Sequence, residues 1–498
     1  MTGTPDYKKD FLLLFLVGAC LSIAQFVMVR DFVTILYGEE VVIVLVTAAF
    51  FSGLSLGYCF ALRFNQRLFE RLFAASVFLH LSFPLSYRYL AVWISGFPHL
   101  GGWAYLALLF FYAFLFSALF AAFLPRLVER HAPALSPENS LKWFYSIELT
   151  GFLAGFVIVG LSWNHPVAHL LPAYWILLCV VLHLVLRNRG LTAGFAAMAF
   201  VASIFLEGWD LQSAALLYER KHGKKEPQVL MAINSPYQRV EVIQDGRGEK
   251  YLYLDGLLNL NATDLEFLNH YIARIPARLI SPENTLIVGN GTLSSVGDVA
   301  ALSRNVVSVE LDPGVLLAGS RFFTPPESLT QLANWNLVVD DGKHFLKTTE
   351  KKFDLIIMDV PSPLTIQEAC LHTVEFYKLA REKITPSGVI AVQLSGPLQR
   401  NNRTPARVVA ALAKVFKEVM VVESKRADRG FAYASDRLPF SPGDLIREAR
   451  SFESALEIIP ANRVHVFLDR AVPLSLDNMD LVLGRGWERF FDRYFGED

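Results

Sequence analysis

Long apolar runs fill the N-terminal part of the chain and constrain its fold more than any other feature. Seven stretches are each long enough to cross the roughly 30 Å hydrocarbon core of a bilayer as a helix. They cover about residues 11–29, 41–62, 72–94, 102–124, 146–162, 168–186 and 190–207. Residues 1–207 are therefore predicted to form a transmembrane domain of about seven helices.

Charged side chains are distributed unevenly along the chain. Residues 1–207 hold 22 of the 93 Lys, Arg, Asp and Glu residues, whereas the 291 residues that follow hold 71. The second part thus has the charge content of a soluble globular domain. The formal net charge of −1 provides no field that would recruit nucleic acid, so no nucleic-acid partner is expected. Four scattered Cys residues, with no Cys/His cluster at metal spacing, predict no metal site.

The basic residues of the first part alternate between its loops. They fall before the first span and in the second, fourth and sixth loops, as Lys8, Lys9, Arg63, Arg67, Arg71, Arg126, Arg130, Lys142, Arg187 and Arg189. The positive-inside rule places these segments in the cytoplasm. With seven spans, the second part of the chain would then face outward.

Several polar residues lie at membrane depth or at its edge. They are Gln25, Arg30, Asp31, Glu39, Glu40, His80, Glu148 and His183. Because charges inside a bilayer are costly, one interpretation is a substrate pathway. The other is an interfacial loop around residues 30–40 and a helix–helix pair at Glu148.

The second part begins with a polar connector at 208–227. Strand-like segments follow at Gln228–Ile233, Gln238–Gln244 and Lys250–Leu254, and an amphipathic helix at 264–280. They predict a small antiparallel β-sheet and helix over residues 228–282. From residue 283 to 498, short apolar strands alternate with helices. This pattern predicts a doubly wound, Rossmann-like α/β domain of the methyltransferase type, built on a parallel sheet.

Glycine or acidic residues follow four of these predicted strands. They are Gly289 with Gly291, Glu310, Asp341 with Gly342, and Asp359. Ligands of doubly wound sheets bind beyond the carboxyl ends of the strands. These residues are therefore expected to converge on one crevice.

The chemistry of these residues suits a nucleoside. Gly289-x-Gly291 lets the backbone approach a ligand at a helix N-terminus. Glu310 follows at the offset, about 20 residues, of a carboxylate that accepts hydrogen bonds from ribose hydroxyls. Asp341 can accept a hydrogen bond from an adenine amino group, and Asp359 can act as a general base or pair with a cationic amine. The third glycine of the dinucleotide fingerprint is absent, which favours a single nucleoside over NAD.

Eight motifs follow one another between residues 229 and 436. They are Ser235-Pro236-Tyr237-Gln238, Leu254-Asp255-Gly256, Asp264 followed by Pro276, Val309-Glu310-Leu311-Asp312, Asp340-Asp341-Gly342, Phe353 to Asp359, Glu375-Phe376-Tyr377 and Gly430 to Ser435. In this order and spacing the sequence resembles the spermidine synthase (polyamine aminopropyltransferase) family. The N-terminal part resembles the multi-span region fused to some bacterial members.

The resemblance implies transfer of an aminopropyl group from decarboxylated S-adenosylmethionine to an amine such as putrescine, without a metal. It assigns Gln238 to the nucleoside thioether, Glu310 to the ribose and Asp341-Gly342 to the adenine. Asp359 corresponds to the acidic residue that helps to deprotonate the attacking amine.

The expected substrate contacts are Asp264, Asn269 and Ser362, and here the sequence departs from the family. Ser362 stands in place of a second acid, and Leu268-Asn269 in place of a Tyr-His or Tyr-Gln pair. The turn that begins at Gly289 contains Asn290 and lacks the family's Asp, which grips the amino end of the donor. The residues that the family uses to bind the nucleoside are retained, whereas many of those that bind the amino groups are not.

Three functions remain open at this point. The first is an aminopropyltransferase, the second a methyl or other alkyl transferase that uses S-adenosylmethionine on a membrane-delivered substrate, and the third a non-enzymatic sensor or transporter of polyamines or nucleosides. The expected partners are a small-molecule amine, the lipid bilayer and a second copy of the chain. An amphipathic helix near 485–491 is expected to serve core packing or dimer contact rather than membrane docking. Because S-adenosylmethionine-type donors are cytoplasmic, the catalytic half is expected to lie in the cytoplasm. The distribution of basic residues with seven spans predicts the opposite side, unless one span is miscounted.

Overall fold

The computed structural model describes residues 6–37, 40–82, 85–97, 101–132, 137–361, 363–401, 403–426, 428–452 and 455–495. The chain divides into two compact units. The first contains the chain up to Gly248, Tyr253–Leu257 and the residues from Phe490 on. The second contains Glu249–Leu252 and Leu258–Arg489.

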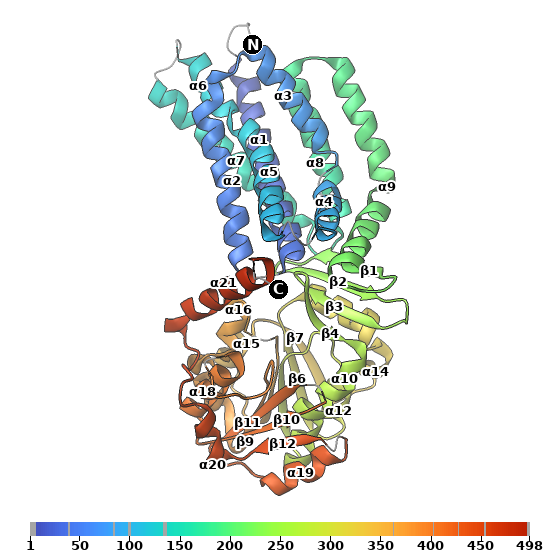
Figure 1. The fold of residues 1–498 in the computed structure, drawn as a ribbon, viewed down its shortest axis with the longest axis vertical. Helices are drawn as coiled ribbons and strands as arrows, with labels where there is room; N and C mark the ends of the chain where they lie inside the picture. Colours follow the sequence, from blue (N-terminus) through green and yellow to red (C-terminus); the bar gives the residue numbers. More distant parts are fainter. Residues whose placement is uncertain are drawn as a thin grey trace. The chain divides into compact units, whose positions relative to one another are not determined.

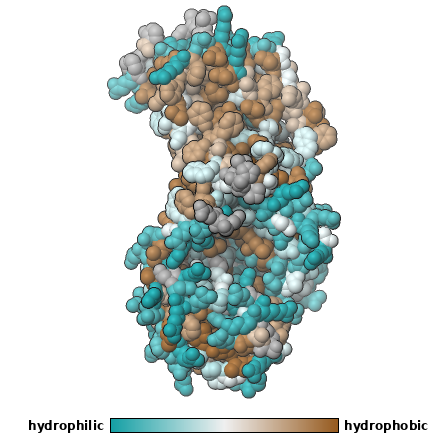
Figure 2. All heavy atoms as spheres, in the orientation of Figure 1, coloured by the Kyte–Doolittle hydropathy of each residue, from teal (hydrophilic) through white to brown (hydrophobic). Residues whose placement is uncertain are grey.

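The first unit is mainly helical (Figure 1). Its helices are α1 (Tyr7–Leu36), α2 (Glu40–Phe60), α3 (Gln66–Leu79), α4 (Leu85–Ser95), α5 (Gly101–Ala121), α6 (Phe123–His131), α7 (Pro137–Leu161), α8 (Val167–Leu186) and α9 (Arg189–Lys221). Within the described residues, six helical stretches are long and apolar enough to cross a membrane: Tyr7–Leu36, Glu40–Arg63, Gly101–His131, Glu138–Leu161, Val167–Leu186 and Arg189–Lys221. Hydrophobic side chains cover much of the surface of these helices in Figure 2. Leu161, for example, is 80% exposed and Phe200 70%.

The predicted span at 72–94 is wrong as one continuous helix. The chain forms two shorter helices there, because α3 ends at Leu79 and α4 begins at Leu85. Pro84 precedes α4 in the sequence and lacks the amide hydrogen that an unbroken helix requires. The buried indole of Trp175 donates a hydrogen bond of 3.1 Å to the carbonyl of His80 and so satisfies a backbone group at the break.

Ion pairs mark the two ends of the helical bundle. At the beginning of α1, Asp10 lies 3.3 Å from Arg130 of α6. At the other end of α1, Asp31 lies 2.5 Å from Arg88 of α4 and 3.3 Å from Arg239 of β2. Figure 1 shows α3 beginning at the first end and α4 ending at the second. The two short helices therefore make one passage along the bundle together, and the chain leaves α9 at the end opposite to its N-terminus.

A four-stranded sheet follows the helices, in the order β1-β2-β3-β4. Its strands are β1 (Gln228–Asn234), β2 (Arg239–Gln244), β3 (Lys250–Leu254) and β4 (Leu257–Asn261), and β1 pairs antiparallel with β2. α9 continues to Lys221, so most of the predicted connector is helical. β4 was not predicted, although Asp255-Gly256 is a hairpin signal. Both residues have positive φ, 48° and 76°, as the tightest hairpin turns require.

An eight-stranded sheet forms the centre of the second unit, in the order β12-β10-β11-β9-β8-β5-β6-β7. Its strands are β5 (Asn284–Gly289), β6 (Asn305–Glu310), β7 (Trp335–Val339), β8 (Phe353–Asp359), β9 (Ile384–Gln393), β10 (Glu418–Ser424), β11 (Arg429–Ser435) and β12 (Leu456–Ile459). β5 to β9 run parallel, as predicted, but β10, β11 and β12 are antiparallel to their neighbours. The prediction of a parallel sheet therefore holds for β5 to β9 and is wrong for β10, β11 and β12. The connection between β10 and β11 is too short for the crossover that parallel strands need.

Helices cover both faces of this sheet. In β8, Ile356 and Met358 pack with α17 (Val374–Lys383) and α18 (Thr404–Val415), whereas Leu355 and Ile357 pack with α11 (Ile275–Ile280), α12 (Val296–Ala300) and α19 (Pro442–Arg450). All four side chains are fully buried. Alternate residues of one strand thus supply two cores, which confirms the doubly wound α/β architecture. The predicted amphipathic helix near the C-terminus is also present, as α21 (Asp480–Phe495).

Candidate active site

The glycine turn at the end of β5 lies directly beside the end of β8. Gly289 pairs with Asp359 across the two parallel strands, and the amide of Asn290 donates a hydrogen bond of 2.9 Å to the Asp359 carbonyl. Gly289 has φ of +85°, and a Cβ atom added there would lie 2.3 Å from the Asp359 carbonyl oxygen. The absence of a side chain is therefore what allows the two strand ends to approach.

The second glycine of the turn brings in the next strand. A Cβ atom at Gly291 would lie 2.3 Å from Val315 Cγ1 and 3.2 Å from Glu310 Oε2. Glu310 is the last residue of β6, and its carboxylate accepts a hydrogen bond of 2.9 Å from the Asp312 amide. The turn and the carboxylate are thus immediate neighbours, as their positions at adjacent strand ends predicted.

Burial raises the pKa of the Glu310 carboxyl to about 7. The negative charges of Asp312 and Asp359 contribute to this rise, while the hydrogen bonds from the amides of Asp312 and Leu311 act in the opposite direction. Burial likewise raises the pKa of Asp359 to about 6. Two carboxyl groups at the ends of the strands that flank β5 therefore titrate close to neutral pH, which is typical of functional sites.

Asp341 and Gly342 complete this edge of the sheet. The Asp340 amide donates a hydrogen bond of 3.1 Å to the Glu310 carbonyl, which places the end of β7 beside that of β6. Asp341 Oδ1 accepts hydrogen bonds from the amides of Lys343 (2.7 Å) and His344 (3.0 Å), so the carboxylate caps α15 (Gly342–Thr348). A Cβ atom on Gly342 would lie 2.6 Å from Val288 Cγ1 of β5.

A polar network links Asn269 to the glycine turn. The hydroxyl of Ser294 donates to Asn269 Oδ1 (3.3 Å) and shares a hydrogen bond of 3.0 Å with Thr292, whose hydroxyl donates to Asn290 Oδ1 (3.2 Å). The Asn290 amide group donates to the Ser295 hydroxyl at 2.5 Å. Asn269 therefore belongs to the site region, and the sequence reasoning missed the hydroxyl residues around it. The clustering of Thr and Ser directly after the glycines was the signal that could have indicated them.

The other expected contacts are placed differently. Asp264 lies in the first turn of α10 (Ala262–Asn269), where its backbone amide donates a hydrogen bond of 2.7 Å to Asn261 Oδ1. Gln238 lies in the turn between β1 and β2, in the first unit. Ser362 lies outside the described residues. No group of three or more His, Cys, Asp and Glu side chains that could hold a metal is present among residues that the structure describes.

Comparison with known proteins identifies the family. The pattern of the Spermine/spermidine synthase domain matches residues 266–424. A polyamine aminopropyltransferase of Thermoplasma acidophilum is 32% identical over 196 residues, which cover 39% of this chain and 71% of that protein. The chain belongs to the polyamine aminopropyltransferase family. A member from Sulfolobus acidocaldarius is 30% identical over 234 residues, which cover 43% of this chain and 74% of that protein.

Membership in the aminopropyltransferase family makes the chain a transferase. The matched domain includes the strand ends from Gly289 to Asp359, whereas Gln238, Asp264 and the helices of the first unit precede it. Among solved structures, a spermidine synthase in complex with the transition-state analogue AdoDATO is 20% identical, covers 52% of this chain and 88% of that chain, and has a TM-score of 0.41.

One further polar group of the aminopropyltransferase domain was not predicted. His372 is buried, and its ring nitrogens lie 3.1 Å from the Tyr377 hydroxyl and 3.1 Å from the Pro361 carbonyl. Burial lowers its pKa to about 4, so the ring is neutral. His372 therefore connects the segment that follows Asp359, through the Pro361 carbonyl, to Tyr377 of the Glu375-Phe376-Tyr377 motif.

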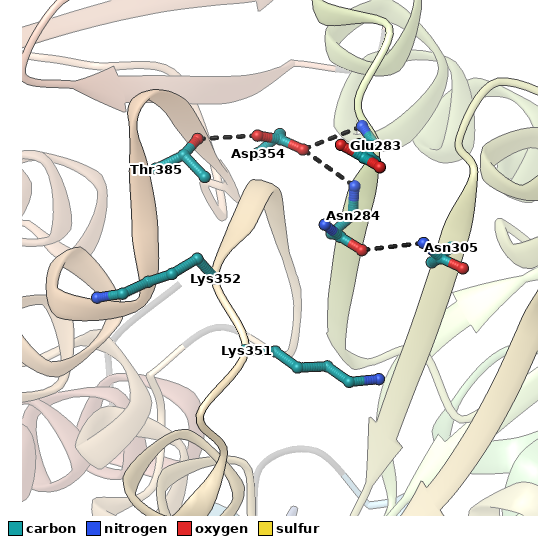
Figure 3. A pocket seen from close by; sticks show the side chains of 7 residues that line it. All are labelled: Glu283, Asn284, Asn305, Lys351, Lys352, Asp354 and Thr385. Atoms are coloured by element: carbon teal, nitrogen blue, oxygen red, sulfur yellow. Dashed lines mark hydrogen bonds between the residues drawn. The ribbon is translucent and has the colours of Figure 1, made fainter.

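A surface hollow of about 450 Å³ lies at the opposite edge of the sheet (Figure 3). Asp354, at the start of β8, lines it and accepts hydrogen bonds from the amides of Glu283 and Asn284 (3.0 Å each) and from the Thr385 hydroxyl (2.9 Å). These bonds join the amino ends of β5, β8 and β9. The hollow thus belongs to the structural end of the sheet and is distinct from the glycine turn.

Proposed function

We propose that the protein transfers an aminopropyl group from decarboxylated S-adenosylmethionine to a small amine. The observation that carries this proposal is the direct pairing of Gly289 with Asp359, with Glu310 beside the same turn. In this proposal the nucleoside binds beside the glycine turn and the two acidic groups. The names of the relatives support the same reaction class.

In this proposal the edge of the sheet holds the donor. Glu310 accepts hydrogen bonds from the ribose hydroxyls, and Asp341 and Gly342 contact the adenine. The donor carries a positive sulfonium, which two carboxylates near the strand ends attract. Because the pKa of Glu310 is raised to about 7, donor binding favours its ionised form and releases a proton.

Asp359 acts as the general base. A protonated amine has no lone pair, so it must lose a proton before it attacks. The amine nitrogen then forms a bond to the aminopropyl carbon, the carbon–sulfur bond breaks, and its electron pair stays on sulfur as the neutral thioether. The proton passes to the Asp359 carboxylate, whose pKa of about 6 keeps it ionised at neutral pH and still able to accept a proton.

Departures from the family on both the donor and the acceptor side favour a second candidate as well. Asn290 offers no carboxylate to the amino end of the donor, and its side chain is already bonded to Ser295 and Thr292. On the acceptor side, Ser362 stands in place of the family's second acid. A dicationic acceptor such as putrescine requires carboxylates near both amines. Methyl or alkyl transfer from S-adenosylmethionine to a membrane-delivered substrate is therefore the alternative transferase reaction.

Calorimetric titration of the detergent-purified protein tests the proposal. Decarboxylated S-adenosylmethionine, S-adenosylmethionine and methylthioadenosine are titrated in parallel. Tighter binding of the decarboxylated donor, followed by turnover with an amine that Asp359→Asn abolishes, is the expected result. Preference for S-adenosylmethionine would support the methyl-transfer alternative. Binding without turnover would contradict both transfer reactions, and no binding of any of the three would contradict a donor site.

We also propose that the first unit is embedded in a membrane, with its exposed apolar helices in contact with lipid. A cytoplasmic catalytic half stays a prediction that rests on the supply of donor. The basic residues before α1 and in the loops after α2, α6 and α8 argue against it, because the chain leaves α9 at the other end of the bundle. A reporter fused after Asp498 tests this prediction: activity only on the outer face would contradict it.

A further inference from the structure

We infer that His372 is a positioning residue for Asp359 and keeps the segment after β8 where that carboxylate can receive the proton of the acceptor amine. The inference rests on the proposed function, because it assumes that Asp359 is the general base. All the residues in the argument belong to the second unit, from the end of β8 to α17.

The chain that follows Asp359 packs directly on the glycine turn. A Cβ atom added at Gly289 would lie 2.8 Å from Val360 Cγ1, in addition to its 2.3 Å approach to the Asp359 carbonyl oxygen. The Val360 side chain is itself buried. Two successive residues thus contact one glycine, so a shift of this segment would move the Asp359 carboxylate relative to the turn.

His372 holds the next residue of the segment. Its Nε2 lies 3.1 Å from the Pro361 carbonyl, which can only accept a hydrogen bond, so Nε2 carries the ring hydrogen. Its Nδ1 then accepts from the Tyr377 hydroxyl at 3.1 Å. Burial lowers the pKa of His372 to about 4 and raises the pKa of Tyr377, so both groups are neutral. Because proline has no amide hydrogen, its carbonyl is the only backbone group through which Pro361 can be held.

The imidazole is supported from two sides. Tyr377 is fully buried in α17, in the hydrophobic core that also contains Val360. Next to His372 in the chain, Thr373 caps the same helix, since its hydroxyl accepts a hydrogen bond of 3.2 Å from the Phe376 amide. The ring is therefore fixed by its own backbone and by Tyr377, and it passes this position on to the segment after Asp359.

The residues between the two ends of this segment are closed by their own hydrogen bonds. α16 (Ile366–Ala369) begins with a reciprocal cap, in which the Thr365 hydroxyl accepts from the Glu368 amide at 3.2 Å. The Glu368 carboxylate accepts in turn from the amides of Thr365 (3.0 Å) and Leu364 (3.2 Å). These bonds set the local shape, whereas the bond from His372 joins the beginning of the segment to its end.

Four variants of the full-length protein separate positioning from stability. His372→Phe keeps a ring but loses both hydrogen bonds, so it leaves the Tyr377 hydroxyl without this acceptor. Adding Tyr377→Phe removes that hydroxyl and should restore part of the stability, but it cannot restore the bond to Pro361. His372→Gln retains an amide that can donate to the Pro361 carbonyl. Thr285→Val is the matched control, because it removes a buried hydrogen bond of 2.8 Å to Ser303 near the amino end of β5.

The readouts are the midpoint of thermal unfolding, the Kd of methylthioadenosine and the kcat with an amine that turns over. His372→Phe should lower the midpoint by a few degrees and kcat by about 10-fold or more, since a small misplacement of a reacting group is costly. The Kd should change less than about threefold, because Glu310 and Asp341 lie at the ends of other strands. The double variant should recover part of the midpoint while kcat stays low, and His372→Gln should recover part of kcat. Thr285→Val should lower the midpoint and leave kcat unchanged.

A wild-type kcat in His372→Phe would overturn the inference. Recovery of kcat together with the midpoint in the double variant, or an equal loss of kcat in Thr285→Val, would also overturn it, because turnover would then follow stability alone. If His372→Phe does not fold, the double variant and His372→Gln carry the test, and failure of all three to fold would make His372 a stability element only. Absence of turnover in the wild type, or turnover that Asp359→Asn retains, would instead contradict the proposed function, so the two failures are distinguishable.

Discussion

Replacing Asp359 with Asn should raise the stability of the protein while it abolishes turnover. The pKa of this carboxyl is raised by burial from its ordinary value of 3.8 to about 6. A raised pKa means that the folded state disfavours the charged form. The contribution of this carboxyl to the free energy of unfolding is fully present below about pH 4, where the group is protonated in both the folded and the unfolded state. It is lost as the pH rises through about 6.

The difference between these two pKa values sets the size of the effect. At pH 8 the buried charge costs the wild type up to about 3 kcal/mol, since a pKa difference of one corresponds to about 1.36 kcal/mol. At pH 5 the buried charge costs the wild type about 1.6 kcal/mol by the same calculation. An amide carries no charge, so Asp359→Asn avoids this cost. For a domain of this size the midpoint of thermal unfolding should rise by roughly 6–12 °C at pH 8 and by about half as much at pH 5.

The assay follows thermal unfolding of the detergent-purified protein at pH 5 and pH 8, alongside turnover. Asp469→Asn is the matched control, because Asp469 is exposed and its loss should leave the midpoint unchanged at both pH values. An Asp359→Asn midpoint at or below that of the wild type at pH 8 would refute the argument from burial. Retained turnover would refute the role of Asp359 as the base, whatever happens to stability.

Three further predictions concern the two edges of the sheet. Glu310→Gln should weaken donor binding about 10-fold. In the wild type, calorimetry should show donor affinity rising as the pH increases through about 7, because the Glu310 carboxylate becomes ionised there, and the variant should lack this rise. An unchanged pH dependence in the variant would contradict the ribose contact. Gly289→Ala should reduce donor affinity and stability because its Cβ would lie 2.3 Å from the Asp359 carbonyl, whereas Gly297→Ala, with no atom within 4 Å, should be neutral; equal behaviour of the two variants would argue against the close approach. Asp354→Ala should destabilise the second unit by about 1–3 kcal/mol in denaturant titrations, through loss of its hydrogen bonds, and leave the nucleoside Kd unchanged; a weakened Kd would show that the two edges are coupled.

The candidate site was predictable to the extent that it depends on strand ends. Parallel strands present their carboxyl ends at one edge, so Gly289, Glu310 and Asp359 had to lie near one another once β5, β6 and β8 were recognised. The hydroxyl network from Asn269 to Asn290 could not be derived in the same way, because it depends on how α10 packs against the turn that follows β5.

The errors in the fold have two physical origins. Mean hydropathy treats residues 72–94 as one run, although α3 ends at Leu79 and α4 begins at Leu85. A hydropathy window does not register that a proline in the sequence, such as Pro84, lacks an amide hydrogen. β11 was recognised as a motif and not as a strand, since its residues Gly430 to Ser435 alternate poorly and are buried on both faces. The charge network of Arg30, Asp31 and Arg239 joins segments far apart in the sequence, which local patterns do not relate.

The two aspartates of β8 differ in role because they lie at opposite ends of the strand. Asp354, at the amino end, accepts three hydrogen bonds that join neighbouring strands, so its charge is fully used within the fold. Asp359, at the carboxyl end, receives no hydrogen bond on its carboxylate from the described part of the chain, and burial raises its pKa to about 6. A buried carboxylate without such partners destabilises the folded protein. The same lack of partners leaves its oxygens available to an incoming amine, so the stability lost at Asp359 and the proposed activity have one physical cause.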